Sequence, residues 1–118
     1  MLKFTEKDLS RPILEKIANN NSIFISLNNN RIHIIKANNP QNASVGWQVK
    51  SKSKQRYLIT LDNKDCVFSL AHELGHILCN HFNKPKIIIV EEIEAWSKAF
   101  RICRPNIKEF FFSIYCLA

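Results

Sequence analysis

The sequence predicts an α+β fold in which amphipathic helices pack against a small antiparallel sheet. Three observations support this prediction. Two pairs of short, strand-like runs are separated by turn residues, apolar residues at helical spacing fill the stretch 64–80, and a second helix-like stretch spans 90–103. With 118 residues, 46% of them hydrophobic, the chain is expected to form a single domain over 1–118 with a packed core.

The first predicted element is an N-terminal helix. Either Thr5 with Asp8, or Ser10 before Pro12, can begin this helix, which then runs to about Ala18. Small polar side chains at such positions accept hydrogen bonds from the first backbone N–H groups of a helix.

Two hairpins are predicted next. The runs 23–27 and 31–36 are strand-like and are joined by the asparagine turn 28–30. A second hairpin is expected over 45–61, with a turn rich in lysine and serine. We expect this second hairpin to form the edge of the sheet. The helices 64–80 and 90–103 and a last helix after position 105 complete the predicted order.

The residues most informative about chemistry are His72-Glu73-Leu74-Gly75-His76, the H-E-x-x-H pattern of zinc peptidases. On a helix the two histidines lie one turn apart on the same face, so their imidazoles can hold one zinc ion. Glu73 follows about 100° around the helix. It is therefore placed to act as general base toward a water that the metal activates.

The surroundings of the motif favour a helix with a core face and a separate polar stripe. The alternative is a solvated polar face that happens to carry two histidines. Gly75 argues against it, because a glycine inside a helix costs about 1 kcal/mol relative to alanine and indicates that another backbone or a substrate comes close. The expected apolar stripe is Val67, Leu70, Ala71, Leu74, Ile77 and Leu78, opposite Ser69, His72, Glu73, His76 and Asn80.

Glu92 is the candidate third ligand, since a catalytic zinc usually takes three protein ligands. Glu91 and Glu94 have surface explanations, and Glu94 is spaced to pair with Lys98. A lone carboxylate in an apolar stripe is costly unless a cation meets it. The alternatives are that Glu92 pairs with a buried Arg or Lys, or caps the helix. The expected stripe is Ile93, Trp96, Ala99, Phe100 and Cys103.

Two further histidines are not expected to be ligands. If the motif helix continues, His81 points toward the core stripe and away from the other two, so we expect a helix-terminal role for it. A metzincin would need Gly and His where this chain has Cys79 and Phe82. His33 lies in a strand-like run, which indicates a structural role.

The motif residues 70–78, L-A-H-E-L-G-H-I-L, followed by Glu92-Ile93-Glu94-Ala95, resemble those of the ImmA/IrrE-type metallopeptidases. The second motif of that family reads E-x-E-A-N-x-F-A-x-x-L-L-M-P, and the resemblance covers roughly 57–105. The chain matches it at Glu92, Glu94, Ala95, Ala99 and Pro105, with Ile102 as a conservative fit, and departs at Trp96, Lys98, Cys103 and Arg104.

The resemblance implies a minimal zincin-like fold and a zinc-dependent endopeptidase. The metal ligands carry over to His72, His76 and Glu92, and the general base to Glu73. The implied substrate is a protein, such as the helix-turn-helix repressor of a phage or another mobile element, that is, a DNA-binding regulator. The residues that bind the substrate are not predicted. The candidates for stabilising the oxyanion are Tyr57, Tyr115 and His81.

Two other functions stay open. The chain can be a zinc-stabilised regulatory or binding module without peptidase activity, in which case a fourth ligand such as Cys79 or His81 closes the site. It can also be a metal-free basic interaction protein that binds DNA or an acidic partner. The net charge of +7 allows this, and much of the positive charge lies in 50–56. We expect that segment to be a solvated hairpin tip rather than a binding surface.

The sequence also indicates a compartment. The N-terminus has no apolar segment typical of a secretory signal, and no stretch of 18 apolar residues can span a membrane. Cys66, Cys79, Cys103 and Cys116 form no C-x-x-C pair. We therefore expect reduced thiols in a cytoplasmic protein rather than disulfides.

Overall fold

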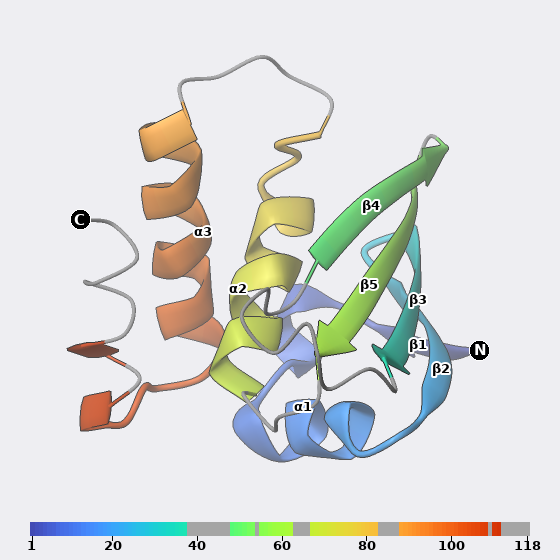
Figure 1. The fold of residues 1–118 in the computed structure, drawn as a ribbon, viewed down its shortest axis with the longest axis horizontal. Helices are drawn as coiled ribbons and strands as arrows, with labels where there is room; N and C mark the ends of the chain where they lie inside the picture. Colours follow the sequence, from blue (N-terminus) through green and yellow to red (C-terminus); the bar gives the residue numbers. More distant parts are fainter. Residues whose placement is uncertain (38–47, 54, 63–66, 83–87, 109, 112–118) are drawn as a thin grey trace.

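The computed structural model describes residues 1–37, 48–53, 55–62, 67–82, 88–108, 110 and 111, and has an α+β architecture (Figure 1). The strands are β1 (Leu2–Phe4), β2 (Ser22–Leu27), β3 (Asn30–Ala37), β4 (Gln48–Ser53) and β5 (Arg56–Asp62). The helices are the 3-10 turn η1 (Glu6–Asp8), α1 (Arg11–Ala18), α2 (Val67–Leu78) and α3 (Ile88–Ile102). None of these helices is both long and apolar enough to cross a membrane.

The five strands form one mixed sheet in the order β1-β2-β3-β5-β4. Both predicted hairpins are present, because β2 pairs with β3 and β4 pairs with β5 in antiparallel fashion. The prediction of a purely antiparallel sheet was wrong. The hairpins join through β3 and β5, which run parallel, and an unpredicted β1 adds parallel to β2. These pairings join segments distant in the sequence, so no local pattern reveals them.

The hairpin turns explain why the strands end where they do. Asn28 and Asn29 have φ angles of 49° and 69°, the left-handed conformation that a two-residue hairpin loop requires. Asparagine adopts it more readily than most residues. Gln55 has a φ of 60° in the second hairpin, whose predicted beginning at 45–47 lies outside the described residues. As predicted, this hairpin supplies an edge of the sheet, β4.

Both predicted start signals near the N-terminus are used, each for a different helical segment. The Asp8 carboxylate accepts hydrogen bonds from the Thr5 backbone N–H at 2.8 Å and the Thr5 hydroxyl at 3.0 Å, which closes η1. These bonds hold the pKa of Asp8 below its ordinary value, the backbone bond contributing most. Ser10 is then the N-cap of α1, with Pro12 in its first turn.

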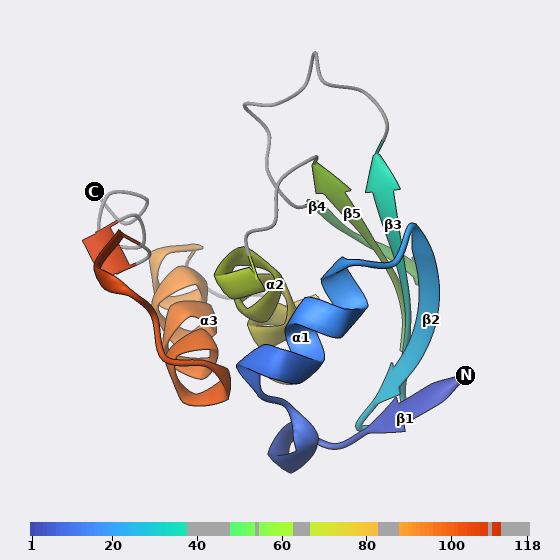
Figure 2. The same ribbon diagram turned by 90° about the horizontal axis from the view of Figure 1, so that it is seen from below.

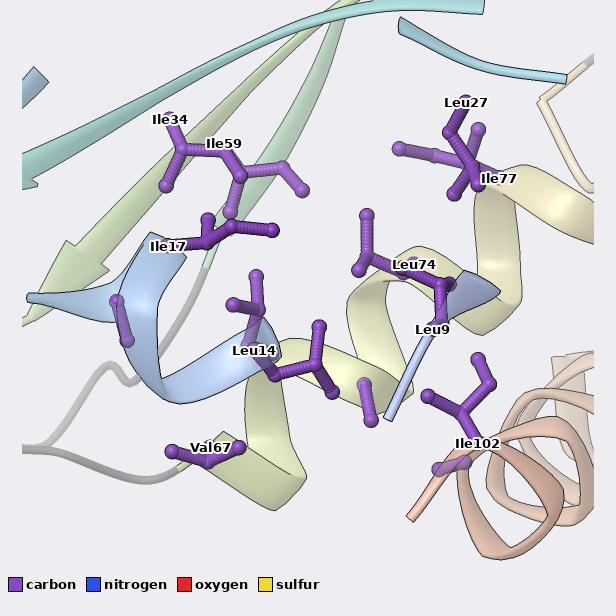
Figure 3. Packing of buried hydrophobic residues seen from close by; sticks show 14 of the residues in the cluster. Leu9, Leu14, Ile17, Leu27, Ile34, Ile59, Val67, Leu74, Ile77 and Ile102 are labelled. Carbon is purple, nitrogen blue, oxygen red and sulfur yellow. The ribbon is translucent and has the colours of Figure 1, made fainter. Parts of the chain in front are cut away.

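The core lies between one face of the sheet and helices α1 and α2, while α3 covers the side of α2 away from the sheet (Figure 2). Leu14 and Ile17 of α1 meet Ile34 and Ile59 of the sheet and Leu74 of α2 in one apolar cluster (Figure 3). Because α2 is covered on both sides, the two histidines of its polar stripe are buried along with most of its apolar stripe.

Gly75 lies where α2 and α3 come closest together. A Cβ built on Gly75 would lie 2.6 Å from the backbone oxygen of Ala95 and 3.2 Å from its Cα. Real Cβ atoms do not approach a backbone oxygen so closely, so only glycine fits without moving a helix. The close neighbour indicated by the glycine is therefore the backbone of α3.

The second helix differs in detail from its prediction. It begins at Ile88, and its buried face carries Ala95, whereas Ile93 is 50% exposed. Lys98, which was expected to pair with Glu94, makes an ion pair with η1. Its ammonium lies 2.5 Å from a carboxylate oxygen of Glu6 in η1, a partner that helix spacing alone cannot reveal. Of the predicted last helix, 107, 108, 110 and 111 are helical, and the remainder lies outside the described residues.

Replacing Gly75 with alanine should destabilise the protein by about 1–3 kcal/mol, although alanine is ordinarily the better helix residue by about 1 kcal/mol. The cause is the clash with the Ala95 carbonyl. Urea unfolding monitored by circular dichroism measures the difference. Ser97→Ala, on the exposed face of α3, is the control and should change stability by less than about 0.5 kcal/mol. An unchanged or increased stability of Gly75→Ala would show that the helices are not in tight contact there.

Candidate metal centre

Helices α2 and α3 bring together the three predicted ligand residues. Nε2 of His72 lies 2.9 Å from one carboxylate oxygen of Glu92, and Nε2 of His76 lies 3.0 Å from the other. The candidate ligand atoms of the three residues all lie within 4.8 Å of one another, so this group can hold a metal ion. The predicted meeting of Glu92 with the two histidines is thus present in the fold.

The partners of Glu92 decide between the explanations offered for it. Within the described part of the chain its carboxylate is paired with the two imidazoles and not with an Arg or Lys. In this arrangement a proton on each Nε2 would point at a carboxylate oxygen of Glu92. A metal ion ligated by the same atoms would take the place of those two protons, so the donor set fits a cation without rearranging the helices.

Trp96 fixes the orientation of one ligand ring. Its indole stacks on the His72 imidazole, with ring centroids 3.9 Å apart and planes 10° from parallel. Trp96 itself is 4% exposed and packs against Phe68 of α2. Trp96, one of the four positions at which this chain departs from the ImmA/IrrE-type pattern, therefore contributes directly to the geometry of the centre.

Glu73 also lies at the centre, on the other side of His72. Its carboxylate oxygen is 3.4 Å from Nδ1 of His72, and its side chain is 15% exposed. A carboxylate facing the second ring nitrogen of a ligand histidine fixes the orientation and the tautomer of that ring. The structure thus places Glu73 beside the ligands, while its action as a general base stays a prediction.

His81 lies against His76, and the expectation that it points away from the other histidines was wrong. The helix ends at Leu78 instead of continuing. Asn80 then adopts a left-handed φ of 62°, and the backbone N–H of His81 donates to the carbonyl of His76 at 3.1 Å. With the 3.0 Å bond from Asn80 N–H to the Ile77 carbonyl, this is a Schellman motif. It folds the chain back and brings Nδ1 of His81 to 2.9 Å from Nδ1 of His76.

Cys79 and His81, considered above as a fourth ligand, belong to a different group. Together with Glu94 they form a second set whose candidate ligand atoms lie within 4.8 Å of one another. His81 contacts the ring nitrogen of His76 that faces away from Glu92. Among the residues that the structure describes, the first group, His72, His76 and Glu92, therefore has no fourth protein ligand.

His76 has the protonation state that metal binding requires. Burial, followed by the charge of His72, lowers its pKa below 6.5 and outweighs the opposing influence of Glu92 and Glu73. His76 is consequently neutral at pH 7, which leaves a ring nitrogen lone pair for a metal.

The remaining residues singled out from the sequence lie outside the centre. Tyr57 is buried in β5 and packs against Phe82, with ring centroids 5.4 Å apart, and Phe82 in turn lies 6.4 Å from the ring of His76. Tyr115 is outside the described residues. His33 stacks on Phe24 in the sheet, in keeping with a structural role. Cys79 and Cys103 are free thiols, whereas Cys66 and Cys116 lie outside the described residues.

The turn at Asn80 can be tested separately from the metal. Asn80→Val should cost about 1–2 kcal/mol, because a β-branched residue resists the left-handed conformation. Asn80→Gly should be at least as stable as the wild type, since glycine is the preferred residue at this position. Urea unfolding in the presence of a chelator measures both. Equal stabilities for the two variants would contradict the Schellman motif.

Comparison of the chain with family models, with curated proteins and with solved structures finds no match. The fold and the site together give an α+β protein with a His72, His76 and Glu92 group that can hold a metal ion.

Proposed function

We propose that this chain is a zinc-dependent endopeptidase in which His72, His76 and Glu92 bind the metal and Glu73 is the general base. The observation that carries the proposal is the approach of two Nε2 atoms, one helical turn apart, to opposite oxygens of a single carboxylate on a facing helix. The H-E-x-x-H spacing and the resemblance to the ImmA/IrrE-type metallopeptidases support it.

The donor set favours zinc over other common metals. Two imidazoles and one carboxylate are typical of catalytic zinc sites, which keep a fourth position open. Calcium and magnesium prefer oxygen ligands alone. The first group contains no thiolate, and thiolates are common in closed structural zinc sites.

In the proposed mechanism bound zinc would supply a Lewis acid that polarises the peptide carbonyl and lowers the pKa of the attacking water. Glu73 accepts a proton from that water as the water oxygen attacks the carbonyl carbon. Glu73 then delivers this proton to the departing amine as the C–N bond breaks, so the carboxylate is regenerated. Trp96, by stacking on His72, keeps the ligand ring aligned during these steps.

The edge strand β4 is the proposed site for the substrate backbone. In the zincin-like arrangement that we propose, an extended peptide binds along β4 by backbone hydrogen bonds and extends the sheet by one strand. β4 pairs with β5, where Tyr57 packs on Phe82 beside His76, so this end of the sheet is connected to the metal group by direct contacts. A protein substrate, such as a helix-turn-helix repressor with an exposed extended segment, fits this mode.

One observation favours a second candidate function, a zinc-stabilised binding module without peptidase activity. The Glu73 carboxylate lies at Nδ1 of His72, where it can orient the ring without taking part in catalysis. In such a module zinc would bind to the same three ligands and add to stability, and no peptide bond would be cleaved. Cleavage assays on the zinc-loaded protein separate the two functions.

The ligand assignment predicts that the wild-type chain binds one zinc ion. It also predicts that Glu92→Ala binds zinc much more weakly. Losing one of three protein ligands should lower the affinity by at least about a hundredfold, more than the 10–100-fold typical of outer-shell residues. Competition with a chromophoric chelator measures it. Glu91→Ala, one residue away on the same helix, is the matched control and should bind as the wild type does. Full affinity in Glu92→Ala would move the third ligand to another residue.

The proposed base predicts that Glu73→Gln keeps zinc within about threefold of the wild-type affinity but loses about 10²–10⁴-fold in cleavage rate. The amide oxygen of Gln can still accept from His72 Nδ1, so the ligand stays oriented. Purified helix-turn-helix repressors serve as substrates, with products identified by mass spectrometry and Glu91→Gln as the control. Wild-type rates in Glu73→Gln would exclude this mechanism. A zinc-loaded wild type that cleaves none of them would favour the binding module.

A further inference from the structure

We infer that His81 is a positioning residue for His76: it accepts a hydrogen bond from Nδ1 of His76 and so directs Nε2 of that ring to the metal. This inference rests on the proposed zinc centre. The sequence alone predicts only a helix-terminal role for His81, or a place as fourth ligand or oxyanion stabiliser. The resulting chain of contacts runs from Glu94 through His81 to His76.

The two histidines are joined by two separate hydrogen bonds. Their Nδ1 atoms are 2.9 Å apart, and the backbone N–H of His81 donates to the His76 carbonyl at 3.1 Å. The second bond belongs to the Schellman motif, so the helix end itself holds the His81 ring in place. With 2% of its side chain exposed, His81 is shielded from water, which would otherwise compete for the bond.

The positions of the protons follow from ligation. A neutral histidine that binds metal through Nε2 must carry its proton on Nδ1. The Nδ1–H of His76 faces Nδ1 of His81, which can only accept, so the His81 proton is on Nε2. That Nε2 is buried and makes no hydrogen bond in the described structure. A carboxylate oxygen of Glu94 lies 3.9 Å away, and its negative charge favours a proton on this nitrogen.

The same geometry argues against the Cys79, His81 and Glu94 group as a second metal centre working beside the first. A metal on Nε2 of His81 would move its proton to Nδ1, which would then face the Nδ1–H of His76 at 2.9 Å. Two N–H donors cannot form a hydrogen bond with each other. A metal ion bound to one group therefore opposes the binding of a metal ion to the other group. With the first group loaded, the second acts as its support.

The test is the zinc affinity of two His81 variants, measured by chelator competition. His81→Leu removes the acceptor and should weaken binding by about 10–100-fold. In His81→Asn the side-chain oxygen can occupy the position of Nδ1, so affinity should stay within about threefold of the wild type. His33→Leu removes a histidine far from the centre and is the control for nonspecific binding. Unfolding of each zinc-free variant in urea accounts for any loss of stability.

A spectroscopic signature separates positioning from packing. In the zinc-loaded wild type and His81→Asn, ¹⁵N NMR should show a slowly exchanging proton on Nδ1 of His76, and His81→Leu should lose it. The inference would be overturned by an unchanged zinc affinity in His81→Leu or by weak zinc binding in both variants. It would also be overturned if the wild-type chain bound two zinc ions, or none. A zinc-loaded wild type without peptidase activity would overturn only the proposed function.

Discussion

The contact between Gly75 and Ala95 is the constraint on which the candidate site depends. Glycine allows the backbones of α2 and α3 to approach until a Cβ would lie 2.6 Å from a carbonyl oxygen. At that separation Glu92 reaches both imidazoles of the motif helix. A wider spacing would loosen the packing of Trp96, Ala99 and Ile102 in the core and would separate the carboxylate from its partners. The cost of a glycine within a helix is thus offset by the geometry it allows.

Burying so many titratable groups between two helices has a cost, which their mutual contacts reduce. His72 and His76 are each 9% exposed, and a buried imidazole or carboxylate without a partner is destabilising. Here Nε2 of His72 and Nε2 of His76 lie 2.9 and 3.0 Å from the two carboxylate oxygens of Glu92. Sequences commonly depart from the simplest apolar packing at functional sites. The two buried histidines of α2, which face Glu92 of α3, are such a departure.

Sequence reasoning succeeded where the signal was local and failed where it depended on distant packing. Helical periodicity located α2 and α3 and placed Glu92 on the inner face, and asparagine placed the turn before β3. The pairing of β3 with β5 joins distant residues and was missed. The position of His81 does not follow from helical periodicity, because the helix ends before Asn80, which adopts a left-handed conformation. Asparagine is a recognised residue at such a helix end.

The most direct test of the central claim is the zinc K-edge X-ray absorption spectrum of the protein loaded with one equivalent of zinc. Ligation by His72, His76 and Glu92 predicts nitrogen and oxygen scatterers alone, at about 2.0–2.2 Å, with the multiple-scattering pattern of two imidazoles. A sulfur scatterer near 2.3 Å would instead place the metal on Cys79. That result would contradict the proposed centre and the mechanism built on it.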